Sequence, residues 1–159
     1  MKNKNLKSFT LLLLSILLFS FTTNRKTLQT ECVSLEKQGY VTFKIWNPVK
    51  GKNYTSKQAQ KDAIIAILFA GISGNNGCIS QPPILNNSTS QDKFKTIEKK
   101  FFSAKGKWTN FTRSSAIETT MPNAIGEKSW KVYQITVSRD ELQKYLQEKQ
   151  IINSLNTAF

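Results

Sequence analysis

The feature that most limits what this chain can fold into is an apolar run near its N-terminus. Lys2, Lys4 and Lys7 precede the run, which covers residues 9–21. A basic segment, an apolar segment and small residues after it are the three parts of a secretory signal. The run is about 13 residues long, or roughly 20 Å as a helix, which is short for crossing a bilayer. We therefore expect residues 1–22 to be a cleaved signal peptide.

The residues around the end of this run leave one alternative open. Ser20 and Thr22 are small, but they do not form an Ala-x-Ala cleavage site, so the segment could also remain as an uncleaved N-terminal anchor. A lipoprotein is disfavoured, because Cys32 lies well beyond the apolar run. We expect the domain to be exported, to the periplasm or to the outer cell surface.

The sequence after the signal has the size and composition of one domain. About 137 residues remain, enough to bury roughly two-thirds of the unfolded surface. Hydrophobic residues make up 39% of the chain and charged residues 21%, as in globular proteins. Residues 63–72 are strongly apolar, but a stretch of about ten residues suits a buried helix. We expect residues 23–31 to be a polar lead-in, residues 32–159 to form a single domain, and the mature chain to have no transmembrane helix.

The chain has two cysteines, Cys32 and Cys78. Cysteines of exported proteins meet an oxidising compartment, where they pair. Cys32 opens the first expected strand, and Cys78 follows the first expected helix, which should run back antiparallel to that strand. Both cysteines would then lie at the same end of the layer, so we predict a Cys32–Cys78 disulfide. A catalytic thiol is disfavoured, because the chain has no histidine to activate it.

Alternating polarity predicts a half-buried strand over residues 40–46. The side chains that would face the core are those of Val41, Phe43 and Ile45. Gly39 is expected to form a bulge or a turn before the strand, so that residues 33–36 could extend it. The first helix is expected to begin at Thr55, which forms a capping box with Gln58, and to end at Gly71.

The second half of the chain predicts two helices and two strands. Residues 71–91 are expected to form a long loop, tied down by Cys78 and by burial of Ile79, Ile84 and Leu85. The elements expected after it are a helix over residues 92–104, a strand over 108–115, a turn over 121–126, a strand over 130–137 and a last helix capped by Ser138 with Glu141. The order β-α-α-β-β-α predicts an α+β fold, with a small, mainly antiparallel sheet packed against helices.

Lysine dominates the charge of the chain. The formal net charge is +13, and 20 of the 23 basic residues remain after the three lysines of the signal are removed. A basic exported protein can bind anionic lipids, acidic polysaccharides or acidic proteins, whereas nucleic acid is not expected outside the cytoplasm. The candidate residues for binding an anionic surface are Lys93, Lys95, Lys99, Lys100, Lys105 and Lys107. A solvated helix face with no ligand is the simpler interpretation of the same pattern.

Two tryptophans are candidates for ligand contacts. Trp46 and Trp108 are expected on strands near loops, with lysines close by in sequence. Aromatic rings beside cations suit the binding of carbohydrates or peptides, although core packing is the simpler interpretation.

No pattern in the sequence identifies an enzyme. Ser90 and Lys93 have the Ser-x-x-Lys spacing of penicillin-recognising enzymes, but the companion motifs of those enzymes are missing. The ten acidic residues are scattered, so no carboxylate pair is evident. We assign no catalytic residue, no metal site and no cofactor. A small hydrolase or transferase with a Ser/Lys or carboxylate site remains the alternative, and a pocket that unites Ser90 and Lys93 would favour it.

The chain resembles small exported proteins of the bacterial cell envelope. The resemblance rests on the signal sequence, on the stretch Tyr54 to Ile72 and on a block made up of Phe101, Phe102, Gly106, Lys107 and Trp108. It covers most of the mature chain and implies an envelope protein, but no activity and no functional residues. We therefore expect a non-enzymatic exported protein that binds either an envelope protein or an anionic glycan or lipid.

Overall fold

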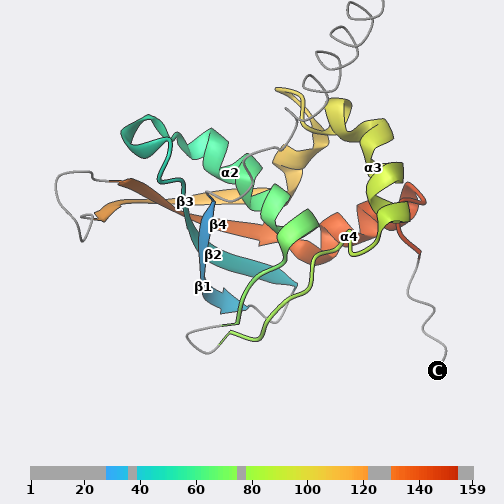
Figure 1. Cartoon of the computed structure of the whole chain (residues 1–159), viewed down its shortest axis with the longest axis horizontal. Helices are drawn as coiled ribbons and strands as arrows, with labels where there is room; N and C mark the ends of the chain where they lie inside the picture. Colours follow the sequence, from blue (N-terminus) through green and yellow to red (C-terminus); the bar gives the residue numbers. More distant parts are fainter. Residues whose placement is uncertain (1–27, 36–38, 75–77, 122–129, 154–159) are drawn as a thin grey trace, which may run out of the picture.

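The computed structural model describes residues 28–35, 39–74, 78–121 and 130–153 (Figure 1). The expected signal peptide and the turn expected at 121–126 lie outside these ranges, except for residue 121. A four-stranded sheet is covered on one side by helices, so the predicted α+β class is confirmed. The strands are β1 (Gln29–Leu35), β2 (Tyr40–Trp46), β3 (Thr112–Met121) and β4 (Trp130–Ser138). The helices are α2 (Ser56–Ile65), α3 (Ser88–Phe101) and α4 (Arg139–Glu148). Shorter helical segments are η2 (Gly51–Asn53), the π-helical η3 (Ala66–Ala70) and η4 (Lys107–Phe111).

The sheet has the order β1-β2-β4-β3, and all neighbouring strands are antiparallel. The alternation predicted in β2 is confirmed, because Val41, Phe43 and Ile45 are all buried. In β4 the same face carries Tyr133, Ile135 and Val137, which are also buried. One face of these two central strands therefore forms one side of the hydrophobic core.

The helix α2 begins as predicted. The Thr55 hydroxyl oxygen accepts a hydrogen bond from the Gln58 backbone N–H at 3.3 Å, and the Gln58 side chain accepts one from the Thr55 N–H at 3.0 Å. The last turn widens into η3, whose side chains Ala66, Ile67 and Leu68 are buried. Gly71 ends it with φ of +75°, and a Cβ there would collide with the carbonyl oxygen of Gln81. A residue with a side chain would therefore be strained at this position.

The predicted disulfide is confirmed. Cys32 of β1 is bonded to Cys78, and their Cα atoms lie 6.3 Å apart. Because Cys78 follows η3, the bond ties an outer strand of the sheet to the segment that leaves the central helix. Ile84 and Leu85 are buried, as expected for this segment, but Ile79 is 74% exposed, so its expected burial was wrong.

The helix α3 lies farther from the sheet and packs through aromatic rings, beside α4 (Figure 1). Phe94 meets Phe69 edge-on at a centroid distance of 5.8 Å, and Phe101 stacks on Tyr145 of α4 at 5.8 Å. Phe101 also stacks on Phe111 of η4 at 6.3 Å. Phe94 and Phe101 are therefore buried, and Ile97 is partly buried.

Several predicted boundaries need correction. Residues 29–35 form a separate strand, β1, which pairs antiparallel with β2 instead of extending it, and it begins inside the expected polar lead-in. The helix α3 begins at Ser88, one turn earlier than expected, because Asn87 caps it by accepting from the Ser90 N–H at 2.9 Å.

Further corrections concern the ends of the last elements. Trp108 lies in η4, and the strand begins only at Thr112. Ser138 precedes α4 but makes no capping hydrogen bond; the Gly39 carbonyl oxygen accepts from the Arg139 N–H at 2.9 Å and the Asp140 N–H at 3.3 Å instead.

Candidate functional site

The six candidate lysines from Lys93 to Lys107 are all exposed, but the structure divides them between the two ends of α3. At the N-terminal end, the Lys93 Nζ donates a hydrogen bond to the carbonyl oxygen of Gln150 at 3.1 Å. The Lys95 Nζ forms an ion pair with Asp92 at 2.7 Å. These two lysines therefore have partners within the fold.

The other four candidates gather at the C-terminal end of α3. Lys99 and Lys100 lie in its last turn. Lys105 and Lys107 flank Gly106, whose backbone lies so close to Phe101 that a Cβ on Gly106 would collide with the Phe101 carbonyl oxygen. The chain therefore folds back against the helix end and brings both later lysines to it.

Two lysines that the sequence analysis missed join this group. Lys61 of α2 places its Nζ 5.0 Å from the ring centroid of Phe102, directly after α3. Lys57 is exposed one turn earlier on α2. Spacing within α2 could have suggested that these two lysines share a face, but the contact with Phe102 depends on how two helices pack.

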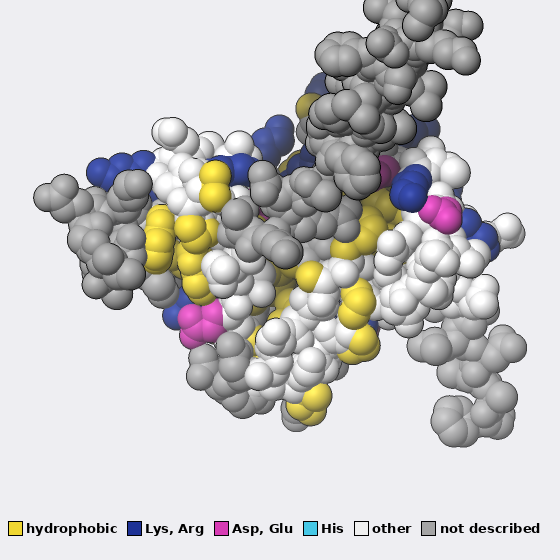
Figure 2. Space-filling view, viewed as in Figure 1, with side chains coloured by type: hydrophobic (Ala, Val, Ile, Leu, Met, Phe, Trp, Pro, Cys, Tyr) yellow, Lys and Arg dark blue, Asp and Glu magenta, His cyan; other side chains and the backbone are white. Residues whose placement is uncertain are grey.

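We call this group the basic surface, and it consists of Lys57, Lys61, Lys99, Lys100, Lys105 and Lys107. Figure 2 shows lysine and arginine side chains mainly over η2, α2 and α3, while few lie over β1 and the segment around residue 80. Among the described residues, none of the six forms an ion pair with a carboxylate. Lys107 lines a hollow together with Glu141 and Glu148, so the other five lysines are the ones most available to an anionic partner.

Neither of the two candidate tryptophans contributes an exposed ring to the basic surface, although Trp108 directly follows Lys107. Trp108 is only 2% exposed, and its Nε1 donates to the Ser103 carbonyl oxygen at 2.9 Å. Its ring is part of the core and cannot contact a ligand from this position. Trp46 is partly exposed at the end of β2, opposite Val132 of β4.

The Ser90–Lys93 pair lines one pocket of about 450 Å³, but it is not arranged as a catalytic pair. Ser90 is 3% exposed, and its hydroxyl donates to the Asn87 carbonyl oxygen at 2.9 Å. The Lys93 Nζ is turned to Gln150 instead. No hydrogen bond joins the two side chains, so the lysine is not placed to take the serine proton.

A buried polar group lies beneath the start of α2. The Tyr54 hydroxyl donates to Asp62 Oδ2 at 3.0 Å, and the Lys50 Nζ lies 3.6 Å from the same oxygen. Burial, together with the negative charge of Asp62 and the hydrogen bond to it, holds the pKa of Tyr54 far above its usual value. The phenol therefore stays protonated and serves the fold rather than acid–base chemistry.

Among the described residues, no group of three or more Cys, Asp or Glu side chains is placed to hold a metal ion. Within the same part of the chain, no helix has the length and apolar character needed to cross a membrane. In comparisons with protein-family models, with curated proteins and with solved structures, no match to this chain was found. The interpretation of function therefore depends on the residues and their geometry.

Proposed function

We propose that this protein is an exported, non-enzymatic component of the cell envelope that binds an anionic partner through the basic surface. The observation that carries the proposal is that Lys99 and Lys100 of α3, Lys105 and Lys107 after it, and Lys61 of α2 meet at one end of α3, with Lys57 one turn before Lys61. A cluster that is assembled from separate parts of the chain produces a stronger local potential than the same lysines spread over the molecule.

Part of this charge pattern also stabilises the fold. Lys99 and Lys100 lie in the last turn of α3, where cations interact favourably with the helix dipole. That effect does not account for Lys57 and Lys61, which lie on another helix, nor for Lys105 and Lys107, which lie beyond the helix end. These four lysines support a binding role over a merely solvated helix face.

The disulfide supports the export part of the proposal, because such bonds persist in oxidising compartments. Binding is favoured over a Ser/Lys enzyme, because the Ser90 hydroxyl is buried and already donates to a carbonyl oxygen. Among anionic partners, lipid headgroups and acidic polysaccharides present the same chemistry to lysine ammonium groups. The experiment below separates them.

The test measures retention of the purified protein on vesicles of phosphatidylcholine with and without phosphatidylglycerol, and on alginate beads, at 10 mM and 150 mM salt. We expect retention on anionic supports at low salt only. The triple variant Lys99→Gln/Lys100→Gln/Lys105→Gln should lower the association constant at low salt by about a hundredfold, since each lysine near an anionic membrane contributes about 1 kcal/mol. In fractionated cells the protein should be found in the envelope, with its N-terminus near residue 23.

A matched control removes three charges elsewhere, with Lys44→Gln, Lys131→Gln and Lys149→Gln on β2, on β4 and after α4. The control should keep most of the retention if the basic surface is the site. An equal loss in both triple variants would mean that only net charge matters, and the proposed site would be wrong. Retention on vesicles alone would identify lipid as the partner, and retention on alginate alone would identify polysaccharide.

A further inference from the structure

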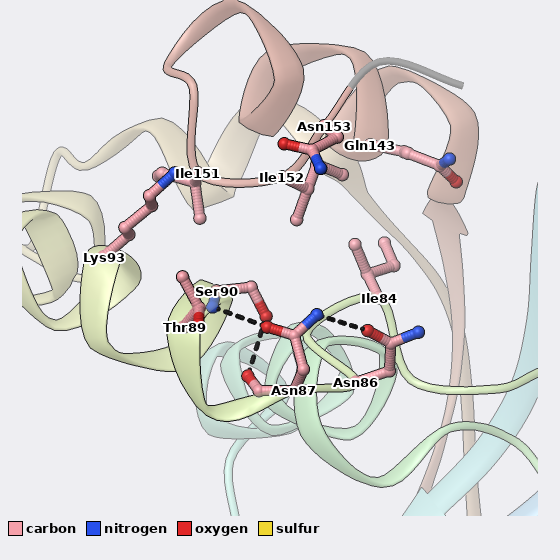
Figure 3. Close-up of a pocket in the computed structure, with 10 residues that line it drawn as sticks. All are labelled: Ile84, Asn86, Asn87, Thr89, Ser90, Lys93, Gln143, Ile151, Ile152 and Asn153. Atoms are coloured by element: carbon pink, nitrogen blue, oxygen red, sulfur yellow. Dashed lines mark hydrogen bonds between the residues drawn. The ribbon is translucent and has the colours of Figure 1, made fainter. Parts of the chain in front are cut away.

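The pocket at the N-terminal end of α3 is separate from the basic surface and has a different chemical character (Figure 3). It lies between the first turns of α3, the segment before that helix, and α4 with the residues that follow it. Its volume of about 450 Å³ lies in the usual range for small-ligand sites. Its polar side chains indicate what kind of ligand would fit.

The amide oxygens of this pocket already accept hydrogen bonds within the protein. The Asn87 Oδ1 accepts from the Ser90 N–H, so its Nδ2 must be the atom that donates to Asn86 Oδ1, at 3.0 Å. The Gln143 Oε1 accepts from the Arg139 guanidinium at 3.2 Å. Because backbone N–H groups and guanidinium groups can only donate, these amide orientations are fixed.

What remains for a ligand is a set of donors, together with the side chains of Thr89 and Asn153, which can donate or accept. The NH₂ groups of Asn86 and Gln143 have no acceptor among the described residues. Lys93 adds a positive charge, and it has two further N–H bonds beyond the one to Gln150. None of the described residues that line the pocket is acidic. A matching ligand must supply acceptors and a negative charge.

The positions of these groups define the shape of the ligand. In Figure 3, Lys93 lies at one side of the pocket, while Asn86 and Gln143 lie at the opposite side. Ile84 lies on the same side as these two amides, and Ile152 points into the space between that side and Lys93. The pocket thus has a cationic end at Lys93, and an opposite end where the neutral donors flank Ile84, with Ile152 between the two ends.

We infer that this pocket binds an N-acylated amino acid with an apolar side chain, as found at the C-terminus of a peptide. The carboxylate accepts hydrogen bonds from Lys93, and the apolar side chain lies against Ile84 and Ile152. The acyl carbonyl oxygen accepts from the NH₂ groups of Asn86 and Gln143. Each part of the ligand then meets the only part of the pocket that suits it.

The test is a titration of the ¹⁵N-labelled protein followed by NMR, with N-acetyl-L-leucine, N-acetyl-L-leucinamide, N-acetylglycine and D-glucuronate as probes. We expect N-acetyl-L-leucine to shift the side-chain NH₂ signals of Asn86 and Gln143. The amide should bind at least tenfold more weakly, because it lacks the charge that pairs with Lys93. N-acetylglycine and glucuronate should also bind more weakly, because neither carries the apolar side chain.

Isosteric variants test the individual donors. Asn86→Asp and Gln143→Glu keep the oxygen that accepts within the protein, but they replace the free NH₂ group with a negative charge. Each should weaken binding of N-acetyl-L-leucine by at least tenfold, and Lys93→Gln should do the same. The matched controls are Asn110→Asp and Lys99→Gln, which change the charge equally outside the pocket and should leave binding unchanged.

Equal affinity for the acid and the amide, or no effect of Lys93→Gln, would overturn the inference. Glucuronate binding as tightly as N-acetyl-L-leucine would overturn the role given to Ile84 and Ile152. Absence of binding to the wild-type protein at 10 mM N-acetyl-L-leucine would reject the site altogether. None of these outcomes bears on the basic surface, because the vesicle and bead experiments leave all pocket residues unchanged.

Discussion

The two longer parts of the helical layer, α2 with η3 and α3, differ in how they are attached to the sheet. The helix α2 lies directly over β2, β3 and β4, and its inward side chains Ala59, Ala63 and Ile64 are fully buried. The helix α3 touches the rest of the protein mainly through the rings of Phe94 and Phe101. One helix is thus part of the core, whereas the other carries the charged end and the pocket on the outside.

This difference indicates how stability and binding are separated in the molecule. Changes to the buried side chains of α2 and to the attachments of that helix should lower the free energy of unfolding and leave binding by the folded protein unchanged. Changes to the exposed side chains of α3 should weaken binding and leave the free energy of unfolding unchanged. If a single change altered both the free energy of unfolding and the binding of the folded protein, the two helices would be coupled more closely than their contacts indicate.

The largest expected effect concerns the disulfide that fixes the segment leaving η3. Cys32 and Cys78 enclose a loop with a sequence separation of 46. Removing the crosslink should lower the free energy of unfolding by about 4 kcal/mol, because the unfolded chain gains conformational freedom. Urea unfolding followed by circular dichroism, with and without a phosphine reductant, measures the change. A Cys32→Ala/Cys78→Ser variant serves as the control, since the reductant should have no effect on it.

If reduction leaves the unfolding midpoint unchanged, or if the wild-type protein isolated from the envelope has two free thiols, the disulfide does not stabilise this fold. If reduction abolishes retention by the basic surface while the protein stays folded, the separation of stability from binding is wrong.

A smaller effect is expected from a matched pair of isoleucines, one on each helix. Ile64 of α2 is 0% exposed, while Ile97 of α3 is only partly buried. Ile64→Ala should cost about 3 kcal/mol through lost burial and the cavity that remains, and Ile97→Ala about 1 kcal/mol. Thermal and urea unfolding of both variants measure the difference. Equal losses would mean that α3 is as firmly packed as α2.

The sequence predicted the α2 region better than the α3 region, and the reason is physical. The alternation in β2 and the capping box at Thr55 are local signals that the structure preserves, and tertiary packing acts in the same direction. The disulfide could be predicted because the expected export and the expected strand-helix order both indicated that Cys32 and Cys78 would pair.

The α3 region depends on contacts that no local pattern contains. Several residues before position 92 could cap α3, and the sequence does not show that Asn87 is the one that does. The pocket beside Asn87 is completed by α4 and the residues after it, which are distant in sequence. The sequence signal for a capping box at Ser138 was present, yet the carbonyl oxygen of Gly39, which is distant in sequence, accepts from the first N–H groups of α4 instead. The approach of Lys61 to Phe102 likewise follows only from how α2 packs beside the end of α3.

The smallest expected effect compares two tyrosines, one next to each helix. Tyr54 is fully buried beside the start of α2, and Tyr145 is partly buried against Phe101 of α3. Burial raises the pKa of both phenols, and for Tyr54 the charge of Asp62 and the hydrogen bond to it raise the pKa further. The unfolded chain therefore loses these protons at a lower pH than the folded protein does.

The sign of the resulting pH dependence follows from proton linkage. Below the unfolded tyrosine pKa of 10.0 both states keep the proton, so the stability is fully present. Above it the unfolded state binds fewer protons, and the free energy of unfolding should fall by about 1.4 kcal/mol per pH unit for Tyr54. Urea unfolding between pH 8 and pH 11 measures this slope in the wild-type protein, in Tyr54→Phe and in Tyr145→Phe. Tyr54→Phe should flatten the slope most, because its phenol is the more buried one and lies beside a carboxylate. If Tyr145→Phe flattens the slope equally, Tyr145 beside α3 is as well shielded from water as Tyr54 beside α2. The two helices would then differ less in burial than their packing suggests.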